Sequence, residues 1–213
     1  MLSEVLQTVE NHPSTDTPYD QDPDVILYMD FQKGNTASFE TLMHKYYGRI
    51  FNFLGRMTGN RDTAEDLTQE VFVRVYKAVS SYQPQSKFQT WIYTIAKNLA
   101  LNELRRSKRS VVSLDAPVDG GDGEMVRQVA DPRSPSPASG LLIEEKQRII
   151  REAVESLPEN QRVVVLLRRY DNLSYAEIAN AMGCTVEAVK SLLSRARVNL
   201  KERLMKHKDL LSR

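Results

Sequence analysis

The segment 174–205 carries side chains that could read double-stranded DNA. Basic and small polar residues recur on the side away from its apolar positions: Glu187, Lys190, Ser191, Ser194, Arg197 and Lys201, with Arg195 beside them. Arg and Lys can chelate guanine O6 and N7 in the major groove, and Ser is an adaptable partner. Residues 190–213 hold eight basic and two acidic side chains, an excess that favours phosphate contact. The segment therefore predicts a DNA-reading surface.

The segment 80–109 mixes aromatic and cationic side chains. They are Tyr82, Phe88, Trp91 and Tyr93 with Lys87, Lys97, Asn98, Asn102, Arg105, Arg106, Lys108 and Arg109. Aromatic planes stack on unpaired bases, cations follow the phosphates, and Asn can read base edges. We expect Phe88 and Ile92 to lie in the core. The residues expected to contact nucleic acid are Trp91, Tyr93 and a face formed by Thr94, Asn98, Leu101 and Arg105. The alternative is that the aromatic residues are all core and that the basic end only complements the helix dipole.

The first of these surfaces requires a helix-turn-helix over 175–194. Ser174 and Glu177 form a predicted capping box, Gly183 suits a left-handed turn, and Thr185 can cap the second helix. Ala179 is small where the two helices must cross, and Val186, Val189, Leu192, Leu193, Ala196 and Leu200 are expected to pack inward. The second helix then presents its basic face to the major groove. A helical hairpin with a solvated charged face is the alternative.

Apolar residues recur at helical spacing in the rest of the chain. Such patterns predict helices over 39–54, 64–79, 88–106, 141–156 and 158–170, with Asp62 and Glu65 as a capping box before the second. No convincing alternation typical of a strand appears. The predicted fold class is all-α.

Composition divides the chain into two small helical domains. Residues 111–140 hold four Pro, four Gly and no aromatic residue, which predicts a flexible linker. Thirteen of the 16 aromatic residues lie between Tyr28 and Tyr93, so only the first domain is rich in them. We expect a disordered acidic tail over 1–22, a first domain over 23–110 and a second over 141–213.

The net charge of +1 conceals a strong partition. Residues 1–30 carry seven acidic and no basic side chains, whereas 31–110 carry thirteen basic and six acidic ones. This asymmetry favours a polyanionic partner. No apolar run is long enough to cross a membrane, and the first residues do not resemble a secretory signal. The single cysteine, Cys184, fits a reducing cytoplasm.

Two separate blocks of sequence resemble one family. DLTQEVFVRVYKA followed by FQTWIYTIAKNLALNELRR, and later LPENQRVVVLLRRYDNLSYAEIANAMGCTVEAVKSLLSRARVNLKERL, are similar to the extracytoplasmic-function (ECF, group 4) sigma factors of bacterial RNA polymerase. The resemblance covers about residues 25–207. It implies that 23–110 is sigma region 2 and that 141–213 is sigma region 4.

The resemblance also implies roles for individual residues. The helix at 66–79 would dock on the clamp helices of the β′ subunit through Asp66, Gln69, Glu70, Val73 and Tyr76. The −10 element would be read and melted by Tyr82, Ser86, Lys87, Trp91, Tyr93, Lys97, Asn98, Asn102, Arg105 and Arg106. The −35 element would be read by Thr185, Glu187, Lys190, Ser191, Ser194, Arg195 and Arg197.

The implied partners are the RNA polymerase core, through its β′ and β subunits, promoter DNA and an anti-sigma factor. The family further implies transcription initiation in a stress or envelope response, by a cytoplasmic protein that is not an enzyme. We expect no cofactor, no metal, no catalytic residue and no membrane insertion, and a monomer outside the holoenzyme.

Three alternatives compete with this interpretation. A DNA recombinase would need a catalytic domain, but no phosphate-binding GxxxxGK[ST] occurs, and His12, His44 and His207 are scattered. A sigma-like decoy for an anti-sigma factor should have lost the basic helix near the C-terminus. A plain helix-turn-helix repressor or activator would not need the aromatic and basic segment at 80–109.

Overall fold

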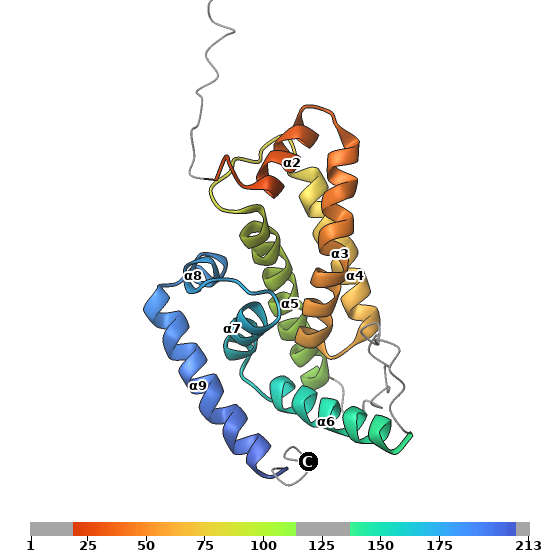
Figure 1. The fold of residues 1–213 in the computed structure, drawn as a ribbon, viewed down its shortest axis with the longest axis vertical. Coiled ribbons are helices and arrows are strands. Elements are labelled where there is room, and N and C mark those ends of the chain that lie inside the picture. Colours follow the sequence, from red (N-terminus) through yellow and green to blue (C-terminus); the bar gives the residue numbers. More distant parts are fainter. Residues whose placement is uncertain (1–18, 114–136, 208–213) are drawn as a thin grey trace, which may run out of the picture.

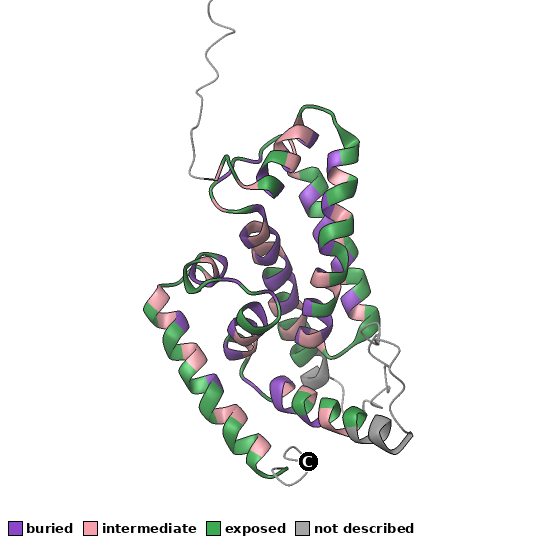
Figure 2. Ribbon diagram, viewed as in Figure 1, coloured by how far each residue is buried: buried purple, intermediate pink, exposed green. Residues whose placement is uncertain are grey.

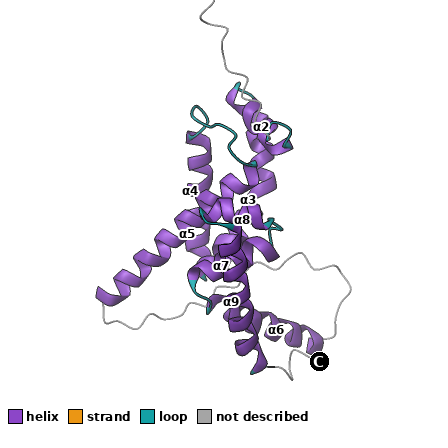
Figure 3. Cartoon of the chain, turned by 90° about the vertical axis from the view of Figure 1, so that its left-hand side faces the viewer, coloured by secondary structure: helices purple, strands orange, loops and turns teal. Residues whose placement is uncertain are grey.

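The computed structural model of the 213-residue chain describes residues 19–113 and 137–207. Every regular element in these two ranges is a helix, which confirms the all-α prediction (Figures 1 and 3). The helices are α2 (Pro23–Gln32), α3 (Thr36–Thr58), α4 (Arg61–Lys77), α5 (Phe88–Ser113), α6 (Pro137–Glu155), α7 (Glu159–Arg169), α8 (Tyr175–Met182) and α9 (Val186–Met205).

The N-terminal half is built around α3, which packs against α2, α4 and α5. Its core is aromatic, as the composition predicts: Tyr28, Tyr46, Phe53 and Phe88 are fully buried. The Tyr28 ring lies 5.3 Å from the rings of both Phe88 and Trp91, and its hydroxyl donates to the carbonyl of Val75. This cluster fixes α5 against α2 and α4, so the outer side of α5 is held rigidly.

The start of α4 differs from the predicted capping box. Gly59 ends α3 in the left-handed conformation (φ 71°), and Asn60 then caps α4 by accepting from the backbone N–H of Thr63 at 2.8 Å. Asp62 lies inside the first turn and is exposed. The cap thus lies two residues before the predicted one, because a left-handed glycine lets the next residue serve as the cap.

The helices also extend into the range predicted to be linker. The helix α5 runs on to Ser113, and α6 already begins at Pro137. Residues 114–136 of the predicted linker and 1–18 of the predicted tail lie outside the described residues. Asp22, at the end of the predicted tail, is the N-cap of α2.

The C-terminal half is centred on α7, which contacts α8 and α9. Val163, Val164, Leu166 and Leu167 are buried there, so this core is aliphatic as predicted. The two halves also pack against each other, with α8 on α5 and both α6 and α7 on α3. Buried side chains form one contiguous core through both halves, and the exposed residues follow the outer faces of α4, α6 and α9 (Figure 2).

Candidate nucleic-acid interface

The helix-turn-helix is set up by local hydrogen bonds. The Ser174 hydroxyl accepts from the N–H of Glu177 at 3.2 Å, and the Glu177 carboxylate accepts from the N–H of Ser174 at 2.7 Å. Gly183 ends α8 at φ 64°, and the Thr185 hydroxyl then caps α9 by accepting from the N–H of Ala188 at 3.2 Å. The predicted caps and turn are therefore confirmed.

Packing determines which side of α9 faces solvent. Val189 and Ala196 are buried against the rest of the C-terminal half, and Leu192, Leu193 and Leu200 are partly buried against the same core. The side chain of Asn199 donates to that of Gln161 on α7 at 2.8 Å, which fixes the rotation of α9. All seven residues predicted for the −35 element are exposed on α9 or at its cap: Thr185, Glu187, Lys190, Ser191, Ser194, Arg195 and Arg197.

The exposed face of α9 carries unneutralised charge. Among the described residues, no acidic side chain forms an ion pair with Lys190, Arg195 or Arg197. Cations held on a rigid helix and free of internal partners are available to phosphates and to guanine edges. This face can therefore enter a major groove.

A second polar face lies on α5. Asn98, Asn102 and Arg105 follow one another at helical spacing and are exposed, as is Arg106, which pairs with Glu103 at 3.4 Å. At the N-terminal end of α5, Trp91 and Ser86 are partly buried and Lys87 is exposed. The Trp91 ring lies 4.7 Å from that of Tyr82. An aromatic residue at one end and amides with guanidinium groups along the helix suit a single strand.

Three residues predicted to belong to this surface are not on it. Tyr93 is completely buried and donates its hydroxyl to the carboxylate of Asp171, and Tyr82 is buried against Tyr28. Lys97 is buried beside Cys184, and burial lowers the pKa of its ammonium group. In contrast, the core positions predicted for Phe88 and Ile92 are confirmed.

The α4 helix presents a third surface of mixed character. Asp66, Gln69, Val73 and Tyr76 are exposed on one side and Glu70 is partly buried among them, while Val71 and Val75 point into the core. The Tyr76 ring packs 5.4 Å from Phe31 and 5.5 Å from Phe39, which continues the apolar strip onto α2 and α3. An apolar strip edged by carboxylates suits a protein partner with a basic rim.

Sequence reasoning missed the residues that join the two halves. Arg49 and Gln89 both meet Asp171 in space but lie 122 and 82 positions from it in the chain. Nothing in the local pattern around any of them marks such a partner, so only the tertiary structure could find them.

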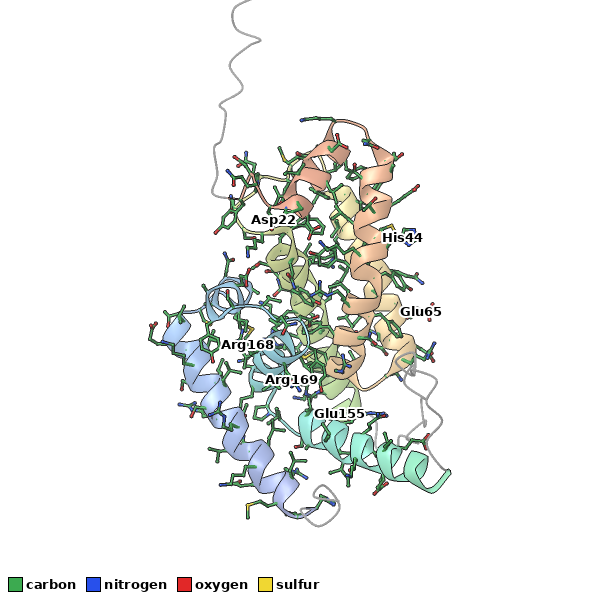
Figure 4. The ribbon with its side chains drawn as sticks, in the orientation of Figure 1. Asp22, His44, Glu65, Glu155, Arg168 and Arg169 are labelled. Atoms are coloured by element: carbon green, nitrogen blue, oxygen red, sulfur yellow. The ribbon has the colours of Figure 1, made fainter. Side chains whose placement is uncertain are left out.

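Within 19–113 and 137–207, no group of three or more His, Cys, Asp or Glu side chains could hold a metal ion. His44 and Glu65 project from the outer sides of α3 and α4 (Figure 4). No helix in the described part of the chain is long and apolar enough to cross a bilayer.

Comparison with protein families finds two matches, one in the N-terminal half and one in the C-terminal half. Residues 42–110 match Sigma-70 region 2, and residues 147–200 match Sigma-70, region 4. The chain is 34% identical over 178 residues to the ECF RNA polymerase sigma-E factor of Escherichia coli (strain K12), covering 82% of this chain and 90% of the relative. It is also 34% identical over 182 residues to the RNA polymerase sigma-H factor of Pseudomonas aeruginosa, covering 83% and 91%.

Solved structures share the fold. CnrH, in complex with the cytosolic domain of CnrY, matches with a TM-score of 0.61 and 22% identity over 86% of this chain and 97% of CnrH. The sigma factor RpoE of Bartonella quintana, in complex with the anti-sigma factor NepR, matches with a TM-score of 0.59 and 24% identity over 78% of this chain and 96% of RpoE. With two sigma regions in order and relatives aligned over most of its length, the chain belongs to the ECF sigma factors of the sigma-70 family.

Proposed function

We propose that this sigma factor recruits the RNA polymerase core to promoters by dividing the task among α4, α5 and α9. The strip on α4 docks on the β′ subunit, the face of α5 holds the non-template strand of the −10 element, and α9 enters the major groove of the −35 element.

The observation that carries the proposal is the pairing of two different DNA-binding faces in one chain. Arg195 and its neighbours on α9 form a convex basic face suited to duplex, whereas Asn98 and Asn102 on α5 lie beyond a partly buried tryptophan, which suits unpaired bases. A repressor needs only the first face. A protein that both locates and opens a promoter needs both.

The cost of opening would be shared between protein and DNA. Bases leave the stack most easily at flexible or weakly paired steps, and a pocket that accepts the flipped base offsets the remaining cost. The loop at 82–88 is the candidate for that pocket. Its two ends, Tyr82 and Phe88, both pack against the ring of Trp91.

We further propose an anti-sigma factor as a partner. Two proteins with this fold have been solved in complex with a second protein: the sigma factor RpoE with the anti-sigma factor NepR, and CnrH with the cytosolic domain of CnrY. The exposed Val73 and Tyr76 on α4 are apolar and accessible, so a regulator could compete there with the polymerase.

A reconstitution experiment tests the function. The full chain is added to RNA polymerase core and genomic DNA, and transcript starts are mapped. We expect new starts that share two sequence elements upstream. If a folded, soluble protein yields no promoter-specific starts, the proposal is wrong; binding to an anti-sigma factor without DNA binding would indicate a decoy.

A further inference from the structure

The C-terminal part of α5 continues the polar face of this helix with basic residues. Figure 3 shows this end of α5 extending beyond the neighbouring helices. Asn98, Asn102, Arg105 and Arg109 are exposed there and recur at intervals of four, three and four residues. At 3.6 residues per turn, these intervals place all four on one side of the helix, which we call the α5 stripe. Along the stripe, amides are followed by guanidinium groups.

Ion pairs distinguish the cations of the α5 stripe from those beside it. Next to the stripe, Arg106 pairs with Glu103 at 3.4 Å, and Lys108 pairs with the first residue of α7 at 2.5 Å. Among residues 19–113 and 137–207, no acidic side chain forms an ion pair with Arg105 or Arg109. The charge that is free to meet a partner at this end of α5 therefore lies on the stripe.

The length of α5 shows that these two arginines do more than complement the helix dipole. The effect of the dipole on a charged side chain falls off within the last turn of a helix. Because α5 ends at Ser113, Arg105 lies eight residues and Arg109 four residues before its end, and the last turn holds no basic residue. Complementing the dipole, the alternative role suggested by the sequence, therefore does not explain Arg105 or Arg109.

The two parts of the α5 stripe suit two forms of DNA. Amides can bond to the base edges of an unpaired strand, and Trp91 lies on the same side, seven residues before Asn98. Residues 94–113 contain no aromatic side chain on which a base could stack. Guanidinium groups without such a platform neutralise phosphates, which are densest along a duplex, at about one charge per 1.7 Å.

We propose that the α5 stripe spans the upstream fork of the open promoter. Asn98 and Asn102 hold the unpaired −10 strand, as in the proposed function on which this inference rests, while Arg105 and Arg109 contact phosphates of the adjoining duplex. The half that carries α9 follows this end of α5 in the chain, so the adjoining duplex is the one that leads upstream to the −35 element.

The spacing along α5 places the boundary between paired and unpaired DNA. At a rise of 1.5 Å per residue, the midpoints of the amide pair and of the arginine pair lie about 10 Å apart. This distance corresponds to about three nucleotides at 3.4 Å each. The fork therefore falls opposite the turn between Asn102 and Arg105.

The first test measures binding of the reconstituted holoenzyme to two fluorescent probes from a promoter found by transcript mapping. One probe is the single-stranded −10 non-template strand, and the other adds one helical turn of duplex directly upstream. The double variant Arg105→Ala with Arg109→Ala should bind the single strand normally and the fork more weakly. Alanine keeps the helix intact. Since two phosphate contacts are lost, raising the salt from about 50 to 200 mM should weaken the unmodified fork complex roughly tenfold more than the variant complex.

Two further variants serve as references for this test. Lys33→Ala with Arg148→Ala removes the same charge from the end of α2 and from α6, and should leave binding to both probes unchanged. Asn98→Ala should weaken binding to both probes equally, because both contain the unpaired strand. If Asn98→Ala binds both probes normally, the strand-binding role of α5 is wrong, and the inference falls with it.

The arginine variant has outcomes of its own, which leave the proposed function intact. Equal weakening on both probes would show that Arg105 and Arg109 contact the unpaired strand, and this would overturn the fork. Normal binding to both probes would overturn any DNA contact by the two arginines and would point to another partner, such as RNA or an acidic protein.

The second test maps the contact directly. A photoreactive benzophenone side chain replaces Arg109 in the full chain, and the holoenzyme is irradiated on the open promoter. Primer extension on both strands should locate the cross-links in the duplex just upstream of the −10 element. Cross-links confined to the unpaired −10 strand, or found on RNA or protein without DNA, would contradict the proposed position of the fork.

Discussion

Arg195 extends from the exposed face of α9, where no described acidic side chain pairs with it. We expect Arg195→Ala to weaken binding of the full chain to −35 duplex by about 1–3 kcal/mol, or roughly 5- to 150-fold, because a good guanine pair has that discrimination. Fluorescence anisotropy with matched and mismatched duplexes measures the change.

Arg148→Ala is the control for the loss of Arg195, because it removes the same charge from α6, where Arg148 pairs with Glu145 and Glu152. It should leave duplex affinity nearly unchanged. A parallel loss of polymerase binding in Arg195→Ala would indicate damage to the domain instead of a missing base contact.

Asn98 is the residue of α5 whose loss should impair opening of the promoter. We expect Asn98→Ala to slow promoter opening by the holoenzyme about 5- to 10-fold, since a lost amide hydrogen bond costs roughly 1 kcal/mol. Binding to intact duplex should change little. Fluorescence of 2-aminopurine placed in the −10 element reports opening. Asn52→Ala, an exposed amide on α3, is the control, and normal opening by Asn98→Ala would remove Asn98 from the site.

Individual residues differ in how far their sequence context predicts their position. Asn98 and Arg105 lie seven positions apart and away from the apolar stripe of α5, so their exposure follows from helical spacing alone. Tyr93 lies beside that stripe, and its burial depends on Asp171, which is 78 positions away. Helical periodicity determines the sides of a helix, but it carries no information on which distant segment covers a side.

At the scale of the element, alanine substitutions at two glycines should change the stability of the protein in opposite directions. Gly183 ends α8 at φ 64°, a conformation that costs an alanine about 1–2 kcal/mol even though nothing lies within 4 Å of the added Cβ. Gly48 lies inside α3 with equally open space around it. An alanine there gains helix propensity and should stabilise the protein by about 0.5–1 kcal/mol.

Urea unfolding followed by circular dichroism tests the pair. We expect Gly183→Ala to lower the free energy of unfolding and Gly48→Ala to raise it. Gly183→Asn should recover part of the loss, because asparagine tolerates the left-handed region. Equal effects of the two alanine substitutions would show that the turn after α8 does not depend on a left-handed residue.

Element boundaries follow from the sequence where the signal is local and unambiguous. Ser174 with Glu177, Gly183 and Thr185 each form the predicted cap or turn because their partners lie within five positions. At the start of α4, Asn60 is the cap instead of the predicted Asp62, because the left-handed Gly59 ends α3 directly before it. The composition of 111–140 predicted a linker but could not show that α5 continues to Ser113.

At the scale of the whole molecule, the sequence predicts two domains but not their association. The aromatic and aliphatic cores merge through contacts of α8 with α5 and α7 with α3. These contacts depend on pairs such as Arg162 with the carbonyl of Met57, which no local pattern reveals. The basic charge predicted for the C-terminal helix stays accessible in the folded chain, because the basic face of α9 remains exposed after the halves have packed.

The buried carboxylate at this interface makes stability depend on pH. Burial raises the pKa of Asp171 to about 6, against the opposing effects of the Tyr93 hydroxyl on α5 and of Arg49 and Arg56 on α3. The packed state therefore binds a proton more tightly than the separated or unfolded state, where the pKa is near 3.8. For a raised acid pKa, the stabilisation is complete below about pH 4 and is lost as the pH rises through about 6.

We expect the Asp171→Asn variant, which mimics the protonated carboxyl, to lack this dependence. Other carboxylates in the chain titrate equally in both proteins, so the difference between their free energies of unfolding isolates Asp171. Relative to Asp171→Asn, the unmodified protein should gain about 1 kcal/mol between pH 8 and pH 5, as a pKa near 6 requires over that interval. Urea unfolding at several pH values measures it. A difference that is constant with pH would show that Asp171 titrates normally and that its carboxylate is not buried between the two halves in solution.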